Sequence, residues 1–313
     1  MKHFLTLAFF LSLSLALSGC GLLPRGDQGN LGSDFQPPSA PASNPDPQQA
    51  GPQDRVIKIA TSTDGLTYTS TGEIISYQAY EPELIEGANG EILLYYTGWI
   101  LGDRLNRSAV AISDEGKIWV YKYLEIKGGD DFWKPTDIDA VKLEDGTVRI
   151  FYTSGNPGVG TGIHYAESLD GINFTYKGVA FAPKDYTAKN PTAFQAGGLW
   201  HMYALSDDKD YPVWHLTSTD GMSFEVYART SFPIDGVSYS PSNGLWVGDV
   251  FHLFLSSPED SIRSFWTKDG NNWMPDDGVR LSKAADERLV TDAAVMPIGE
   301  SRYLMVYTTK APL

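Results

Sequence analysis

From residue 55 onward, the apolar residues form short runs rich in β-branched and aromatic side chains, separated by polar turns, a pattern typical of β-strands. The strongest runs are Ile92–Thr97, Val148–Thr153, Leu199–Tyr203, Val250–Phe254 and Tyr303–Tyr307. Each run follows a shorter strand that opens with an acidic or polar residue, namely Glu81, Asp137, Asn190, Ser240 and Asp292. The pattern therefore predicts five similar hairpins and almost no helix.

A short polar motif recurs between these hairpins. Its glycines, at positions 65, 116, 171, 221 and 270, lie 51, 55, 50 and 49 residues apart, and an Asp or Glu precedes each one. Glycine readily takes the positive φ of a tight hairpin turn, and Asp or Ser side chains bond to nearby backbone N–H groups. An aromatic residue three positions after each glycine is expected to pack between neighbouring sheets. A repeat of this length predicts a β-propeller.

Five inner and five outer hairpins give five four-stranded blades. The chain begins with the outer two strands of a blade, around residues 56–75, and ends with inner strands around residues 292–309. Pairing of these halves would close the ring and remove its free edge. We therefore predict an all-β, five-bladed β-propeller over residues 55–313. A kelch propeller has a similar period, but its paired glycines followed by an aromatic residue are not found in register.

The repeated turn resembles the Asp-box of sialidase-type propellers, shortened by one residue, and in those proteins the box is structural. The N-terminus resembles a bacterial lipoprotein. An apolar run, Phe4–Leu17, follows Lys2, and Leu17-Ser18-Gly19-Cys20 matches a lipobox in which Cys20 would be lipidated after removal of residues 1–19. The alternative is an ordinary signal peptide followed by an unrelated cysteine.

Residues 20–54 are rich in Pro, Gly, Ser and Gln without apolar periodicity, which predicts a flexible tether. We therefore expect an exported, monomeric protein that is held by its lipid on a bacterial membrane, the outer membrane or cell surface if the cell is Gram-negative. Cys20 is the single cysteine, so the mature fold has no intrachain disulfide and no catalytic thiol. The net charge of −15 argues against nucleic acid and anionic lipid as partners.

Strand direction in a propeller places the first residues of the innermost strands around one axial funnel. Glu81, Asp137, Asn190, Ser240 and Asp292 are therefore expected to meet there. Further candidates for binding lie in the same strands and loops: Asp139, Trp99, Arg107, Trp133, Lys134, Lys189 and Tyr239. Aromatic faces beside carboxylates suit a sugar, whose ring stacks on the aromatic while its hydroxyls bond to carboxylates and amides. The alternative is that these are ordinary solvated loop residues.

The blade number, the period and the acid-Pro or Asp-x-Asp start of the inner strands resemble the five-bladed superfamily of glycoside hydrolase families 43, 32, 62, 68 and 130, over roughly residues 55–313. The family 43 pattern implies Glu81 as general base and Asp137 as the residue that tunes the acid. Asn190 stands where the general acid belongs, and an amide cannot donate that proton. Asp292 and Asp139 are candidates for the missing role.

Two functions follow from this resemblance. The first is a glycoside hydrolase that acts on short or terminal sugars through carboxylates, requires no cofactor and holds at most a calcium ion on the axis, as some family members do. The second is a non-catalytic propeller that binds carbohydrate or serves as a scaffold. A propeller that binds proteins is the remaining alternative. No His-x-x-x-His, Gly-x-Ser-x-Gly or phosphate-binding glycine loop is present.

Overall fold

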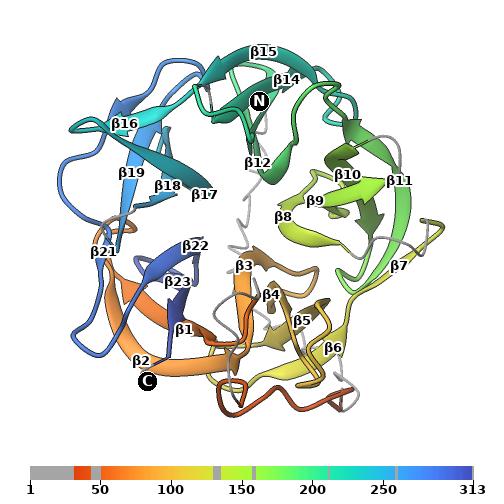
Figure 1. Cartoon of the computed structure of the whole chain (residues 1–313), viewed down its shortest axis with the longest axis vertical. Coiled ribbons are helices and arrows are strands. Elements are labelled where there is room, and N and C mark those ends of the chain that lie inside the picture. Colours follow the sequence, from red (N-terminus) through yellow and green to blue (C-terminus); the bar gives the residue numbers. More distant parts are fainter. Residues whose placement is uncertain are drawn as a thin grey trace, which may run out of the picture. The chain divides into compact units, whose positions relative to one another are not determined.

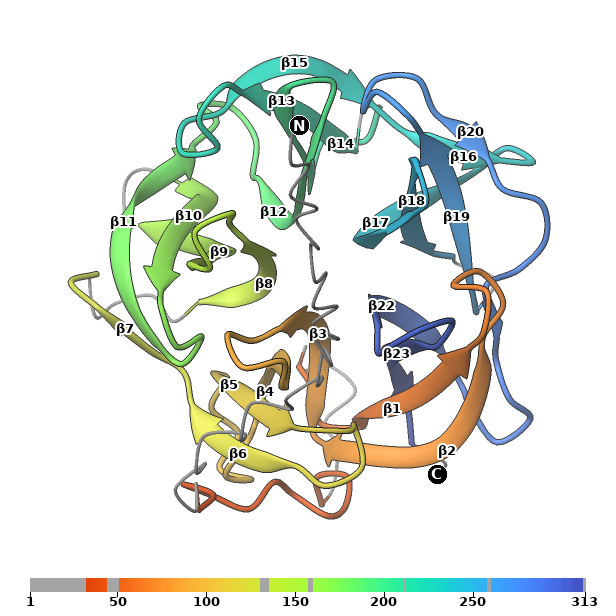
Figure 2. The same cartoon turned by 180° about the vertical axis from the view of Figure 1, so that it is seen from behind.

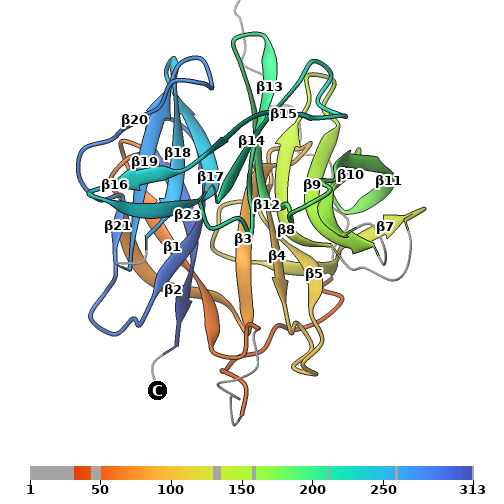
Figure 3. The same ribbon diagram turned by 45° about the horizontal axis from the view of Figure 1, so that its top comes forward.

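The computed structural model describes residues 32–43, 51–129, 135–156, 160–210, 212–257 and 260–311. Five β-sheets surround a central axis, and each sheet contributes one innermost strand to it (Figures 1 and 3). The described residues contain only strands, turns and loops, so none of their segments is a helix long and apolar enough to cross a membrane. The predicted five-bladed propeller is confirmed.

The strands follow chain order from the axis outward in four of the blades. Blade 1 consists of β3 (Ala79–Glu86), β4 (Ile92–Gly98), β5 (Arg107–Ser113) and β6 (Val120–Tyr123). Blade 2 consists of β8 (Thr136–Lys142), β9 (Val148–Asn156), β10 (Gly160–Ser168) and β11 (Asn173–Phe181), with the short β7 (Glu125–Lys127) outside β11. Blade 3 consists of β12 (Lys189–Ala196), β13 (Leu199–Leu205), β14 (Val213–Ser218) and β15 (Glu225–Thr230).

Blade 4 carries two additional short strands, and blade 5 joins the two ends of the ring. Blade 4 consists of β17 (Val237–Val247), β18 (Val250–Ser256), β19 (Ser261–Thr267) and β20 (Met274–Pro275), with β16 (Phe232–Ile234) on β17 and β21 (Leu281–Ser282) on β19. Blade 5 consists of β22 (Val290–Pro297), β23 (Tyr303–Lys310), β1 (Arg55–Ser62) and β2 (Thr69–Tyr77).

Blade 5 confirms the predicted closure. β1 pairs with β23 in an unbroken antiparallel register from Arg55 opposite Lys310 to Ser62 opposite Tyr303. In Figures 1 and 2 the orange β1 and β2 therefore complete one sheet with the blue β22 and β23. The ladder between the two ends of the domain satisfies backbone groups that an open ring would leave unpaired.

The repeated turns have the expected geometry. Gly65 has a φ of 76°, its N–H donates to Ser62 Oγ at 3.0 Å, and Asp64 Oδ1 accepts two further backbone N–H bonds. Two of these turns also bond to the preceding blade through a tyrosine on its second strand. Tyr95 OH donates to the carbonyl of Gly171 at 2.8 Å, as Tyr203 OH does to Gly270 at 2.7 Å. The turns are thus part of the scaffold.

The hydrophobic core consists of five clusters, each between two neighbouring blades. Leu93 of blade 1 packs in one cluster with Ile150 and Phe174 of blade 2. Phe194 of blade 3 stacks on Phe251 of blade 4 at a centroid distance of 3.9 Å. Because each sheet buries both of its faces against its neighbours, the blades hold one another in position and fix the inner strands around the axis.

Residues 32–43, here called the strap, correct the expectation of a flexible tether throughout residues 20–54. Asp34 N–H donates to the Tyr121 carbonyl of β6 at 2.8 Å, and Lys122 Nζ contacts Asp34 Oδ1 at 2.8 Å. Phe35 is 7% exposed in the core between blades 5 and 1 and stacks on Tyr123 at 5.1 Å. Phe35, the one aromatic residue of the strap, thus packs into this apolar core and anchors the strap on the propeller.

Candidate functional site

Each innermost strand begins with a β-bulge. In β3, Tyr80 pairs with Thr97 and Glu83 pairs with Tyr95, so β3 has one more residue in this interval than its partner. The same shift occurs at the start of β8, β12, β17 and β22. A bulge redirects a side chain that the regular pleat would hold elsewhere. In β3 the redirected residue is Glu81.

Four of the bulges place a non-glycine residue in the left-handed region. Glu81, Asp137, Asn190 and Asp292 have φ values of 53°, 50°, 49° and 50°. This conformation costs an L-residue about 1–2 kcal/mol, and such strain is concentrated at functional sites. In β17 the register assigns this position to Pro241, whose ring fixes a negative φ. Ser240 therefore lies one residue too early to belong to this set, which corrects its predicted place.

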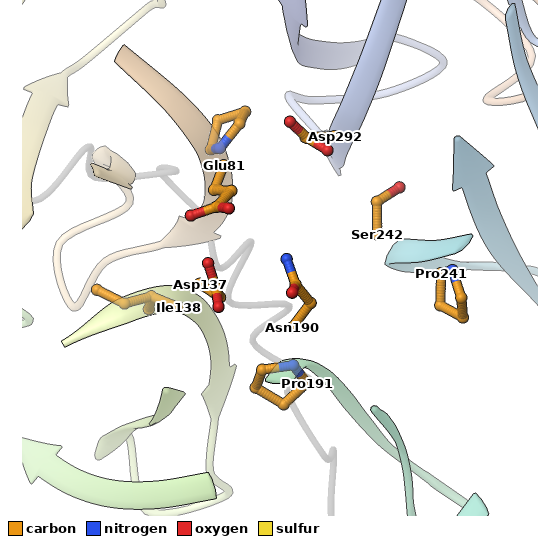
Figure 4. Close-up of a pocket in the computed structure, with 9 residues that line it drawn as sticks. Glu81, Asp137, Ile138, Asn190, Pro191, Pro241, Ser242 and Asp292 are labelled. Carbon is orange, nitrogen blue, oxygen red and sulfur yellow. The ribbon is translucent and has the colours of Figure 1, made fainter. Parts of the chain in front are cut away.

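The four strained residues come from four blades and line one axial pocket. The other lining residues are Pro82, Ile138, Pro191, Pro241 and Ser242. Figure 4 shows the polar ends of these four residues around one space, with the carboxyl groups of Glu81 and Asp137 next to each other. The cavity volume is about 30 Å³, which is room for one or two water molecules. The enclosed space therefore admits only a small polar group of a ligand.

Burial and charge favour a protonated Glu81. Burial raises its pKa well above the usual range, and Asp137 raises it further through its negative charge and a shared hydrogen bond. Glu81 Oε2 is buried and has no hydrogen-bond partner among the described residues. Burial also raises the pKa of Asp292, whose carboxylate accepts a hydrogen bond from Thr291 Oγ1 at 2.8 Å. A protonated Glu81 suits a proton donor better than the general base that the family resemblance implies.

Beneath the pocket, buried polar groups connect the blades across the axis. Asn243 Nδ2 donates to Glu83 Oε1 at 2.9 Å and Oε2 at 2.7 Å, and Asn243 Oδ1 accepts from Val295 N–H at 3.0 Å. Asp139 is 3% exposed and accepts from Ala193 N–H at 3.0 Å. Burial raises the pKa of Asp139 to about 8 and that of Glu83 well above its usual range.

This lower set of residues, Glu83, Asp139 and Asn243, is called the axial brace below. Asp139 does not line the pocket, so its position favours a role in joining blades over contact with a substrate. Sequence reasoning missed Glu83 and Asn243. The available signal was their spacing, because each lies two residues after a bulge residue and alternate residues of a strand share a face.

Among the predicted rim residues that the structure describes, none lines the pocket. Trp99 and Tyr239 are 2% and 3% exposed and pack in the protein interior, so neither offers a free ring face to a sugar. Arg107 forms a two-pronged ion pair with Asp103 at 2.6 and 2.7 Å. Lys189 is exposed immediately before the pocket residue Asn190. Three candidates lie outside the described residues: Cys20, Trp133 and Lys134.

Metal binding stays a prediction. In the part of the chain that the structure describes, no group of three or more His, Cys, Asp or Glu side chains is arranged to hold a metal ion.

The fold has many relatives among solved structures. No family model matches the sequence, and no curated protein matches it. A thermostable family-43 glycoside hydrolase is similar with a TM-score of 0.59 and 16% identity, covering 74% of this chain and 84% of that one. The native arabinanase of Bacillus subtilis gives 0.51 and 13%, covering 72% and 92%. An α-L-arabinofuranosidase from Clostridium thermocellum gives 0.55 and 13%, covering 71% and 79%. The chain shares the five-bladed propeller fold of these enzymes.

Proposed function

We propose that the protein is a glycan-active propeller, and that it hydrolyses glycosidic bonds of short or terminal sugars with the carboxyl groups of its axial pocket. The observation that carries this proposal is the convergence of Glu81, Asp137 and Asp292 from three blades, each held in a strained bulge. Glycoside hydrolysis needs two carboxyl groups on opposite sides of the scissile bond, one protonated and one ionised.

In this proposal Glu81 donates the proton to the leaving oxygen. Its pKa is raised by burial and by Asp137, so it keeps its proton to a higher pH than an ordinary carboxyl group does. Asp292 acts as the general base that activates the attacking water. Glu81 thereby supplies the acid that the amide of Asn190 cannot provide. Asp137 acts through Glu81, because its negative charge keeps the neighbouring carboxyl group protonated.

The test compares Glu81→Gln and Asp292→Asn with Glu73→Gln, a substitution of an exposed carboxylate on β2. Hydrolysis of arabino-, galacto- and manno-oligosaccharides and of p-nitrophenyl glycosides is measured for each. Glu81→Gln should lose far more activity on oligosaccharides than on p-nitrophenyl glycosides, because p-nitrophenolate leaves without a proton. Equal losses on both kinds of substrate would refute the assignment of Glu81 as the acid.

The role of Asp137 has a separate signature. Asp137→Asn removes the charge that raises the pKa of Glu81, so that pKa falls. The alkaline limb of the pH–activity profile, where the acid loses its proton, should move to lower pH. An unchanged limb in an active variant would contradict the proposed coupling.

A second candidate function is carbohydrate binding without cleavage. Two observations favour it. The pocket is small, and Asn190, which stands in the place of the general acid, carries an amide that cannot donate a proton. Retention of an oligosaccharide by the wild-type protein without any hydrolysis would decide for this function. Retention should then depend on Glu81, whose unpartnered Oε2 is available to a sugar hydroxyl.

We also propose that the protein is exported and anchored through lipidated Cys20. The support is the lipobox sequence Leu17-Ser18-Gly19-Cys20, which lies outside the described residues. Labelling of growing cells with a radioactive fatty acid should mark the wild-type protein and leave Cys20→Ser unmarked. A labelled Cys20→Ser variant would refute the anchor.

A further inference from the structure

Blade 3 presents an exposed aromatic ring, Tyr186, on a rigid support. Tyr186, in the loop between β11 and β12, is 42% exposed. The guanidinium of Arg229 lies 4.9 Å from the centre of its ring and 3.8 Å from that of Trp214. Arg229 is held in turn by Asp208 Oδ2 at 2.9 Å and Ser206 Oγ at 3.1 Å. The ring therefore rests on a cation that is itself fixed, and stacking on that cation restrains the tyrosine.

The loop that carries Tyr186 is fixed to the same blade. The carbonyl of Thr187 accepts from Trp214 Nε1 at 2.9 Å, and the N–H of Thr187 donates to Asp207 Oδ1 at 2.8 Å. Tyr186 precedes the pocket residue Asn190 by four positions, so their Cα atoms are at most about 14 Å apart. The ring itself packs on Arg229 of the outer strand β15, so a ligand that contacts both the ring and the axial pocket must be an oligosaccharide of several units.

We propose that Tyr186 forms a second sugar subsite, on which a more distant unit of the substrate stacks while the reacting unit sits over the axial pocket. This inference rests on the proposed function and refines it, because it assigns an oligosaccharide as the substrate in preference to a monosaccharide glycoside. A flat ring with few rotatable bonds loses little entropy when it binds. Burial of an apolar sugar face against it is favourable.

The surroundings of Tyr186 favour a sugar over a protein partner. The adjacent loop residues Lys184, Asp185 and Lys189 are exposed and charged, so the ring is not part of a broad apolar patch. Protein interfaces are centred on clusters of apolar residues that become fully buried. An exposed ring beside charged loop residues matches the composition of a site where each sugar unit offers an apolar face and several hydroxyls.

The test measures KM, or Kd if no turnover occurs, for oligosaccharides from disaccharide to hexasaccharide and for p-nitrophenyl monosaccharides. The variants are Tyr186→Ala, Tyr186→Phe and Arg229→Lys, which keeps the charge but loses the flat stacking surface. Tyr227→Ala on β15 is the matched control, since Tyr227 is 60% exposed on the same blade. Thermal unfolding confirms that each variant is folded.

Tyr186→Ala should raise KM or Kd about tenfold for the longer oligosaccharides and leave the value for monosaccharide glycosides unchanged. Tyr186→Phe should behave as wild type, and Arg229→Lys should show a smaller loss of the same kind. If Tyr186→Ala and wild type are equal at every chain length, the subsite is refuted while the proposed function stands. A wild-type protein that neither binds nor hydrolyses any of these sugars would overturn both.

Discussion

The bond between Asn243 and Glu83 in the axial brace should be among the strongest side-chain interactions in the domain. Asn243 Nδ2 approaches both carboxylate oxygens of Glu83, at 2.9 and 2.7 Å, and both residues are at least nine-tenths buried. A hydrogen bond to a charged group contributes about 1.5–3 kcal/mol, and one between neutral groups about 1 kcal/mol. Because burial raises the pKa of Glu83, the coupling energy should depend on pH.

A double-mutant cycle with Asn243→Ala and Glu83→Ala, measured by urea unfolding, isolates the coupling energy. We expect about 1 kcal/mol at a pH where Glu83 is neutral, rising toward about 3 kcal/mol as the pH increases and Glu83 becomes ionised. The control cycle uses Lys142 and Glu86, a pair that joins blade 2 to blade 1 and whose side chains are 33% and 59% exposed. Such an exposed pair should give less than about 1 kcal/mol. A coupling below about 0.5 kcal/mol for the buried pair, or one that falls with rising pH, would refute the reasoning.

Three further predictions concern the scaffold. Gly270→Ala should lower the free energy of unfolding by about 2–3 kcal/mol, because the added Cβ would lie 2.6 Å from His201 and the backbone has a φ of 76°. Gly248→Ala, which has open space around it, should lower it by about 1 kcal/mol. Equal losses in urea unfolding would contradict this reasoning. Burial lowers the pKa of His215 to about 4, so below about pH 6.5 the unfolded protein binds a proton on His215 that the folded protein does not. The free energy of unfolding should therefore fall by up to about 3 kcal/mol from pH 6.5 to 4. His215→Phe should flatten this pH dependence, and an unchanged slope in the variant would contradict the role of His215. Phe35→Ala should lower the free energy of unfolding by about 3 kcal/mol and make the strap sensitive to limited proteolysis. A strap as resistant to the protease as in wild type would show that Phe35 does not anchor it.

Most of the fold could be predicted from local sequence signals. Apolar strand runs and the spacing of Gly65, Gly116, Gly171, Gly221 and Gly270 predicted the blades, and the order of hairpins predicted that β1 would pair with β23. These features are readable because period-two strands and tight turns depend on neighbouring residues. Phe35 was missed for the opposite reason, since only the groove between blades 5 and 1 makes that residue part of the core.

The candidate site was likewise predicted only in part. The sequence by itself predicted that Glu81, Asp137, Asn190 and Asp292 lie at one rim, because each stands at the start of an inner strand and the propeller topology fixes the direction of these strands. The tertiary structure alone decided that the bulge register assigns Pro241 in place of Ser240, that Asp139 joins blades beneath the pocket, and that Glu81 lies against Asp137. Register shifts, burial and the proton affinity of a carboxyl group all depend on groups far away in the chain, so they are set only when the blades pack around the axis.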